Sequence, residues 1–567
     1  MTRSGQLRLL LLLLLWVHGG DEASTQSRSL KTLDTTGSLS LRPPSPSTPP
    51  PPPPSLPVSW ISSPSSIFQH YADSSLRPFY HGLASGDPLS DQVIIWTRVT
   101  PEVHKPIDVQ WMVALDSSMK CVVECGEYRT DATRDYTVKV DVQGLNPGSI
   151  YYYRFRALGK NSPIGRTRTA PEGTTDHLRF AVASCANYQH GYFNAYGRIA
   201  DRDDLNAVLF LGDYLYEDGV RTDDYGPIPR REHHPSQELH SLDEYRKRHA
   251  FYKLDPDLRR VHERHPFIAI WDDHEMIDDC YTKGAHLHSD RKDGTWEDRK
   301  RSAVQAYFEW MPVREPRGKE HYRIFRSFRY GDLAEIIMLD TRHEGREEQL
   351  ESSNDQHLFD SQRSMLGEEQ LHWFLTKLAE SDAQWKLVGN QVVMSQIRGA
   401  RNLDAWDGYP AERDKVLSLI EKNGIKNVLF LTGDVHISIA SNIARNPFDR
   451  TKYDPTTGFG SIAVELTTPS ISSANMNELL KLPPRNYKTI IAEQGLYMLN
   501  GHVKMAELDN HGYFLLDLTS ERAQADWYFV KTVQSRESGE RWWSSWRVRD
   551  GCARLEKRDV PSVTRKN

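Results

Sequence analysis

Three apolar segments of this sequence each end in residue types that bind metal ions. They are AVLFLGDYLYE at 207–217, PFIAIWDDHE at 266–275 and NVLFLTGDVH at 427–436. In each segment an apolar run is followed by Asp, and a Tyr or His stands within three residues of that Asp. A single Gly-Asp pair after a strand is often only a turn, but turn chemistry does not account well for three such ends. We therefore predict a metal site that the three segments share.

Each apolar run has the composition of a parallel strand that is buried on both faces. In open α/β sheets, ligands bind outside the carboxyl ends of the strands, which is where these polar residues stand. A fourth run, LRFAVASC at 178–185, ends in Cys185. A lone Cys at a strand end is usually a small buried side chain, but beside the other three ends its thiolate becomes a candidate ligand.

The order of the motifs SCANY, GDYLYE, WDDHE and GDVH resembles that of the PhoD-type alkaline phosphatases of the metallophosphoesterase superfamily. The resemblance extends upstream to HGLASGDPLSDQVIIWTR and downstream to NHGYFLLDL, so it covers about residues 80–530. It implies an α/β fold with two packed sheets flanked by helices, preceded by an immunoglobulin-like β-sandwich. It also implies hydrolysis of phosphate esters at a centre containing Fe(III) and Ca(II).

The same resemblance implies six metal ligands: Cys185, Asp213, Tyr216, Asp273, Asp434 and His436. It places the thiolate, the phenolate and the imidazole on the iron side, with Asp213 as the bridging carboxylate. Asp273 and Asp434 fall on the calcium side.

The implied catalytic residues are Asp213 and His274, the second of which matches a histidine that lies beside the substrate phosphate. Asp278 and Asp279 stand where the resemblance implies an asparagine, which is a departure in the outer calcium shell.

Phosphate ester cleavage explains why these residue types occur together. Two cations about 3.5–4 Å apart, bridged by a carboxylate and a solvent oxygen, lower the pKa of that solvent so that hydroxide exists at neutral pH. The cations also neutralise charge that develops in the transition state. Thiolate and phenolate favour trivalent iron, and carboxylates suit a hard divalent ion; zinc or manganese is the alternative.

We therefore expect attack of a metal-bound hydroxide on phosphomonoesters, phosphodiesters or both, with His274 as the proton donor to the leaving oxygen. Two other classes remain open at this stage. Iron with thiolate and phenolate ligands also suits an oxidoreductase or haloperoxidase, although the carboxylate-rich second site disfavours it. A non-catalytic, stalked interaction protein is the other class, although the intact Asp and His set disfavours it.

The predicted organisation is a signal peptide at 1–24, a Ser/Pro-rich linker at 25–66, a β-sandwich at 67–172 and a catalytic domain at 173–567. The apolar run at 9–17 is too short to span a bilayer, which favours secretion without stable membrane insertion. The unbroken prolines at 49–54 predict an extended, solvated spacer.

The balance of 71 basic against 77 acidic residues gives no strong field for nucleic acid, so small phosphate esters are the expected partners. The oligomeric state stays open.

Alternation of apolar and polar residues between about 81 and 168 predicts the short strands of the sandwich. Cys121 and Cys125 are too far apart on one straight strand to form a disulfide. They are therefore either joined across a turn or free. Three further polar residues, Asn390, Gln391 and His511, could contact substrate or support a ligand, or could simply satisfy turns and packing.

Overall fold

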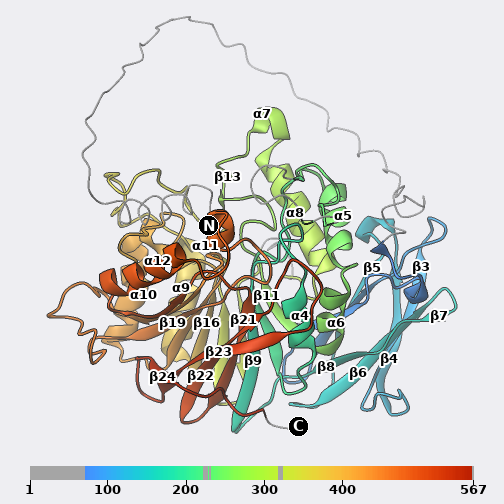
Figure 1. Ribbon diagram of the computed structural model, residues 1–567. Helices are drawn as coiled ribbons and strands as arrows, with labels where there is room; N and C mark the ends of the chain where they lie inside the picture. Colours follow the sequence, from blue (N-terminus) through green and yellow to red (C-terminus); the bar gives the residue numbers. More distant parts are fainter. Residues whose placement is uncertain (1–70, 221–227, 229–230, 317–322, 565–567) are drawn as a thin grey trace, which may run out of the picture.

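The computed structural model describes residues 71–220, 228, 231–316 and 323–564 (Figure 1). The predicted signal peptide and the linker lie outside the described residues. Among the described residues, no helix is both long and apolar enough to cross a bilayer.

Two large sheets form the centre of the molecule (Figure 1). The ten-stranded sheet contains, in spatial order, β24 (Glu556–Arg558), β23 (Glu540–Arg549), β22 (Arg522–Val530), β21 (Gly512–Thr519), β9 (His177–Ala183), β10 (Ala207–Leu211), β11 (Pro266–Ile270), β1 (Leu83–Gly86), β2 (Val93–Arg98) and β5 (Thr137–Val142). The seven-stranded sheet contains β14 (Arg326–Tyr330), β15 (Ala334–Met338), β16 (Trp385–Asn390), β17 (Val428–Thr432), β19 (Ala463–Thr467), β18 (Ser438–Ile443) and β20 (Val503–Glu507).

Helices lie outside these sheets. They are α4 (Asn194–Ala200), α5 (Leu242–Tyr252), α6 (Pro256–Arg264), α7 (Asp290–Asp293), α8 (Trp296–Trp310), α9 (Gly367–Glu380), α10 (Pro410–Lys422), α11 (Met476–Leu479) and α12 (Tyr487–Leu499). A short hairpin, β12 (Cys280–Tyr281) and β13 (Gly284–Ala285), precedes α7.

Strand alternation in the seven-stranded sheet explains this layering. Leu387 and Leu429 face the core that also contains the strands of the ten-stranded sheet. Their neighbours Val388 and Phe430 face a second core, formed with the apolar sides of α9 and α10. Because successive strand residues point to opposite faces, an entirely apolar strand serves both cores at once. The predicted class, two packed sheets flanked by helices, is confirmed.

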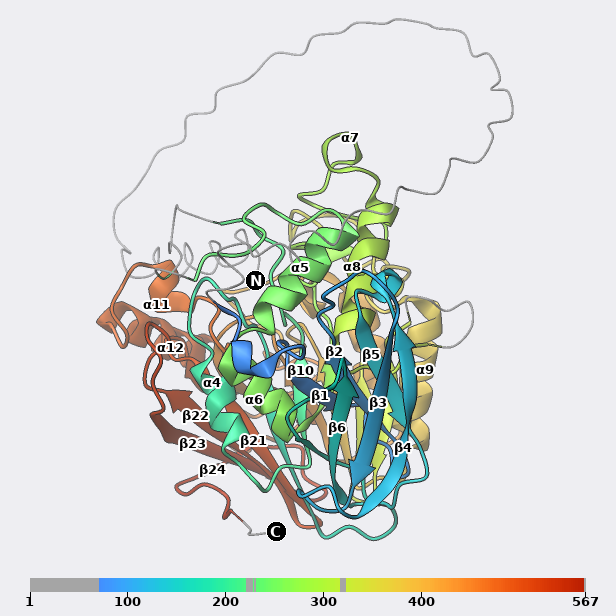
Figure 2. The same ribbon diagram turned by 90° about the vertical axis from the view of Figure 1, so that its right-hand side faces the viewer.

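The N-terminal β-sandwich shares a sheet with the rest of the chain. Its separate sheet contains β4 (Val122–Thr130), β3 (Ile107–Ala114), β6 (Ile150–Ala157) and β7 (Lys160–Asn161), with β8 (Gly165–Arg168) also paired to β6. Figure 2 shows β3, β4 and β6 beside β2 and β5. The facing strands β1, β2 and β5 belong to the ten-stranded sheet, because β1 pairs in parallel with β11. The two sheets enclose one apolar core, but hydrogen bonds cross the predicted domain boundary.

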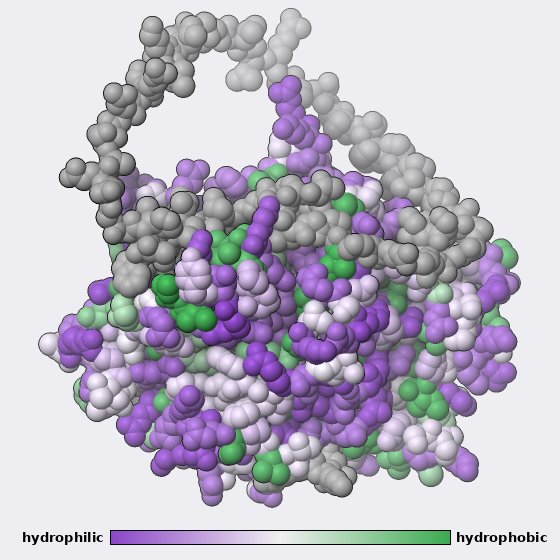
Figure 3. Space-filling model, in the orientation of Figure 1, coloured by the Kyte–Doolittle hydropathy of each residue, from purple (hydrophilic) through white to green (hydrophobic). Residues whose placement is uncertain are grey.

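The cysteine alternatives of this region are resolved. Cys125 lies within strand β4, Cys121 immediately precedes that strand, and both thiols are free. Figure 3 shows one face of the molecule, on which hydrophobic residues are scattered in small groups among hydrophilic ones.

A buried group of basic residues lies where β2 meets α5, α6 and α8. His249 stacks on Trp310 at 6.3 Å between ring centroids, and the Nζ of Lys253 lies 4.7 Å from the centre of the Trp96 ring. Burial lowers the pKa of His81, His249 and His262 well below the usual 6.5, and the charge of Lys253 adds to this effect. Burial also lowers the pKa of Lys253 to about 7.

These shifts predict acid lability of the fold. Below about pH 6.5 a histidine in the unfolded chain binds a proton, whereas the same histidine buried in the folded protein stays neutral. The unfolded state therefore binds more protons than the folded state, and the stability of the fold decreases. The stability is therefore fully present above that pH and is lost as the pH decreases. Each such histidine lowers the free energy of unfolding by up to about 1.4 kcal/mol for each unit by which the pH decreases.

Replacing His249 with Phe should make the midpoint of urea unfolding less sensitive to pH between 7 and 5. The control is His357→Phe, because the His357 side chain is exposed. Equal pH dependence of the His249 variant and the wild type would contradict this explanation.

Candidate metal centre

The four strand ends predicted to converge do so. Strands β9, β10 and β11 are parallel neighbours, so their carboxyl ends share one edge of the sheet. The backbone N–H of Cys185 donates to the carbonyl of Gly212 at 3.1 Å, which joins the ends of β9 and β10. The end of β17 approaches from the other sheet, since a Cβ added to Gly433 would lie 3.0 Å from the Ser184 side chain.

The backbone at these ends is unusual. Four predicted ligands have left-handed φ values between 57° and 61°: Cys185, Asp213, Asp434 and His436. Residues other than glycine rarely adopt this conformation, and strained backbone of this kind clusters at functional sites. Gly212 itself has a φ of 101°, and a Cβ there would lie 2.4 Å from the Cβ of Asp272. Glycine is therefore needed for β10 and β11 to end so close together.

The side chains form three overlapping groups of metal-binding type. Within each group, the three ligand atoms lie within 4.8 Å of one another: Cys185, Asp213 and His436; Asp213, Asp273 and His274; Asp273, Asp278 and Asp279. Asp213 belongs to the first two groups, which is the arrangement expected of a bridging carboxylate. The third group places the two unexpected aspartates next to Asp273.

Tyr216 completes the first group. Its hydroxyl donates to Oδ2 of Asp213 at 2.9 Å, lies 3.1 Å from Nε2 of His436 and accepts from Ser473 at 2.8 Å. Nδ1 of His436 lies 3.1 Å from the carbonyl of Ala474, which can only accept, so Nδ1 carries the proton. The lone pair of Nε2 therefore faces the site. Burial lowers the pKa of His436 well below its usual value and keeps the ring neutral, as a metal ligand requires.

Buried oxygens in the site lack donors. Among the described residues, Oδ1 of Asp213 and Oδ1 of Asp279 are buried without a hydrogen-bond partner. Burial raises the pKa of Asp213 to about 6, and burial followed by the Asp213 charge raises the pKa of the Cys185 thiol well above its usual value. A bound cation would provide the missing partner and would reverse such shifts. The donor set therefore fits cations: sulfur, phenol and imidazole on one side of Asp213 and carboxylates on the other.

His274 lies beside this group with a carboxylate partner. Its Nδ1 donates to Oε2 of Glu217 at 2.8 Å, and its ring lies 4.1 Å from the Tyr216 ring. Burial alone would lower its pKa, but the charges of Glu217, Asp213 and Asp273 together raise it well above the usual value. Glu217, which is not among the predicted metal ligands, therefore orients the ring and favours the protonated imidazole that an acid requires.

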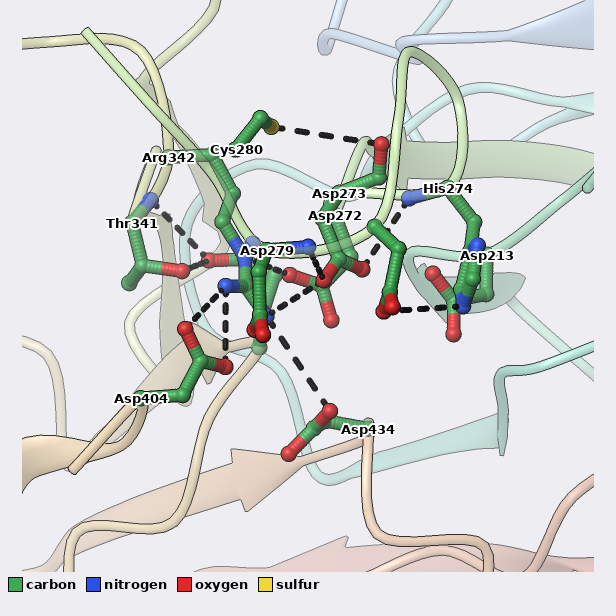
Figure 4. A network of polar contacts seen from close by, with 12 residues as sticks. Asp213, Asp272, Asp273, His274, Asp279, Cys280, Thr341, Arg342, Asp404 and Asp434 are labelled. Carbon is green, nitrogen blue, oxygen red and sulfur yellow. Dashed lines mark hydrogen bonds and ion pairs between the residues drawn. The ribbon is translucent and has the colours of Figure 1, made fainter. Parts of the chain in front are cut away.

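A buried arginine links the acidic residues around Asp273 and Asp434 (Figure 4). Arg342 is fully buried and donates to Asp404 at 2.7 Å and 2.9 Å, and also to Asp272. Its Nη2 lies 3.4 Å from Asp273 and 4.0 Å from Asp434, so both predicted calcium ligands share this neighbour.

The sequence placed Arg342 at a strand end near the cleft and Asp404 in a loop near its entrance, but it did not predict that the two form an ion pair. The available signal was the polar end of the apolar run at 332–340, directly before Thr341 and Arg342.

Glu275 was also given no separate role, although it braces the ends of two strands. Its carboxylate accepts from the backbone N–H groups of Asp213 at 3.1 Å, Tyr214 at 2.6 Å and Asp272 at 2.8 Å. Three donors on one side chain fix the backbone that carries Asp213.

The remaining polar residues bond to the protein itself. Nε2 of Gln391 donates to the carbonyl of Leu339 at 2.7 Å, and Oδ1 of Asn390 accepts from Trp406 at 2.9 Å. His511 lies 2.9 Å from the hydroxyl of Ser470. These contacts are the ones expected if Asn390, Gln391 and His511 satisfy turns and packing, which was the alternative to contacting substrate or supporting a ligand.

Two packed sheets with metal-binding side chains gathered at their strand ends have the architecture of a metallophosphoesterase-like hydrolase. The family model of the PhoD-like phosphatases matches residues 180–527, and that of the PhoD-like phosphatase N-terminal domain matches residues 65–171. The chain belongs to the PhoD-like phosphatase family, as the motif order predicted.

Two relatives show how far the similarity extends. Alkaline phosphatase D of Bacillus subtilis (strain 168) is 36% identical over an alignment of 397 residues, and the match covers 65% of this chain and 66% of that protein. A solved structure of PhoD superposes with a TM-score of 0.76 at 29% identity, covering 87% of this chain and 94% of the other. Family membership favours a phosphoester hydrolase over the redox enzyme and the interaction protein.

Proposed function

We propose that this protein is a secreted, metal-dependent phosphatase that hydrolyses phosphomonoesters, phosphodiesters or both. The observation that supports this most directly is the position of Asp213, which belongs to two adjacent groups of metal-binding side chains. Two cations that share one carboxylate are the arrangement that activates water for attack on a phosphate ester.

The site residues divide this work among themselves. Cys185, Tyr216 and His436 would hold one cation, Asp273 and Asp434 would hold the other, and Asp213 would contribute to both. When bound, the cations lower the pKa of water and neutralise the charge of the phosphoryl oxygens. His274, oriented by Glu217, delivers its proton to the leaving oxygen.

The donor types support Fe(III) with Ca(II) as the cofactors. Thiolate and phenolate stabilise a trivalent ion, and the carboxylate side suits a hard divalent ion; zinc or manganese is the alternative. Asp278 and Asp279 extend the carboxylate side beyond Asp273. Secretion rests on the sequence of residues 1–24.

Hydrolysis of para-nitrophenyl phosphate and of bis(para-nitrophenyl) phosphate, each with and without a chelator, tests the proposal. We expect chelator-sensitive release of para-nitrophenol, and the ratio of the two rates assigns the ester class. Release that persists in full after the metals are removed would contradict the proposal.

Replacing His274 with Gln should impair substrates with poor leaving groups most. Without an acid, an alkoxide must leave unprotonated, so kcat on an alkyl phosphate should fall by about 10²–10⁴-fold. The fall on para-nitrophenyl phosphate should be much smaller, because its leaving group is stable as an anion. His372→Gln, on the exposed side of α9, is the control, and equal losses on both substrates would contradict the role as acid.

A further inference from the structure

A pocket of about 390 Å³ lies outside the metal centre, between α10 and the loop that follows β16. Its volume is within the range of small-molecule sites. It is lined by four arginines and two phenylalanines: Arg398, Arg401, Arg413, Arg445, Phe359 and Phe448. None of these residues belongs to the groups that hold the metals.

Two of the four arginines are balanced by aspartates that line the same pocket. Arg413 is buried and donates to Asp407 at 2.7 Å, while Arg445 contacts Asp414 at 2.7 Å.

The other two arginines, Arg398 and Arg401, are not paired with an aspartate of the lining. No ion pair within the described part of the chain involves Arg398 or Arg401. Arg398 and Arg401 are therefore two positive charges of the lining with no carboxylate at ion-pair distance among the described residues, whereas Arg445 also contacts Glu421 at 3.2 Å.

Arg398 is held in place by its surroundings. Its backbone N–H donates to Oδ1 of Asn500 at 2.7 Å, and its carbonyl accepts from Nδ2 of the same side chain at 3.1 Å. Its guanidinium lies 3.9 Å from the centre of the Phe448 ring, a cation–π contact that fixes the plane of the fork. Gly399 has a φ of 83°, so the chain turns directly after the arginine. A fixed loop presents this cation to the pocket, which reduces the entropy lost on binding.

We propose that this pocket is a second, non-catalytic site that binds a phosphate group. Two guanidinium charges match a phosphate dianion, and the planar fork of arginine bonds phosphate oxygens in pairs. Phe359, which is 71% exposed, offers apolar surface for an organic substituent. The phosphate is either free inorganic phosphate or that of an organic phosphate ester. The site goes beyond the proposed function because binding there needs no metal and no bond cleavage.

Calorimetric titration of the metal-loaded protein with inorganic phosphate and with phenylphosphonate, which has no ester bond to cleave, tests the site. We expect a pocket site in addition to the metal centre. In Arg398→Gln/Arg401→Gln the pocket site should weaken at least about tenfold, because two charge-assisted contacts are lost. Turnover of para-nitrophenyl phosphate at low concentration should be unchanged, which reports an intact fold.

Two controls separate this claim from the proposed function. The variant Arg156→Gln/Lys160→Gln removes the same charge from an exposed part of the N-terminal sheet and should leave both binding sites intact. Asp213→Asn should abolish binding at the metal centre and retain it in the pocket.

Each possible result of the titration either supports the pocket site or overturns it. Phenylphosphonate binding the pocket about tenfold more tightly than phosphate, through burial of part of its ring, would support the site and identify an organic ester as the ligand. Equal affinities would support it with inorganic phosphate as the ligand. A single binding site in the wild type, or a second one unchanged in Arg398→Gln/Arg401→Gln, would overturn the proposal.

Discussion

Replacing Asp213 with Asn should reduce kcat/KM on para-nitrophenyl phosphate by at least about 10³-fold, or about 4 kcal/mol of transition-state stabilisation. The amide keeps the shape of the carboxylate but has no negative charge with which to bridge two cations. Both groups of metal-binding side chains that share Asp213 are affected together.

Metal analysis provides an independent measurement of this effect. If Asp213 bridges, the Asn variant should lose metal from both sides of the site in the same preparation. Asp203→Asn is the matched control, because Asp203 is exposed and its carboxylate pairs with the partly exposed Arg264, away from the metal-binding groups. Near-normal turnover of the Asp213 variant, with its metals retained, would contradict the bridging role.

Replacing Arg342 with Met should destabilise the fold by about 3–5 kcal/mol, the usual cost of removing one partner of a buried ion pair. Asp272 and Asp273 would then lie buried without their counter-charge, and Asp404 would keep only that of Arg346. Urea unfolding of metal-depleted protein measures the effect without compensation from bound cations.

Further variants separate charge from shape. Arg342→Lys keeps the charge but loses the fork, so it should recover only part of the loss. Removing Asp404 as well, in Arg342→Met/Asp404→Asn, should cost less than the sum of the single changes, because the two residues are coupled. The exposed pair of Arg129 and Asp108 is the control, and Arg129→Met should change stability by less than about 1 kcal/mol. A similarly small effect at Arg342 would show that the acidic residues do not depend on it.

The strand ends were predictable because local pattern and chemistry agree there. The run at 207–211 is apolar throughout, which suits a strand that serves two cores, and it ends at a glycine followed by Asp213. The same logic located Cys185 and Asp434. The structure brings these ends together because β9, β10 and β17 all end at the contact between the two sheets.

Other parts of the site could not be predicted because they depend on contacts between distant segments. Arg342 and Asp404 are 62 positions apart, and nothing local to either indicates that they form an ion pair. Glu275 was part of a motif, but its role depends on N–H groups of residues that follow both β10 and β11. Likewise, alternation predicted the strands of the N-terminal sandwich, but not that β1 would pair with β11, some 180 residues further along.

The most direct test of the account is the metal content of the purified protein, measured by mass spectrometry together with its visible absorption spectrum. The account predicts that the protein contains iron together with calcium and shows a charge-transfer band from the Tyr216 phenolate. It also predicts that a chelator removes the metals, the band and the activity together. Full phosphatase activity in protein that contains no bound metal would contradict it.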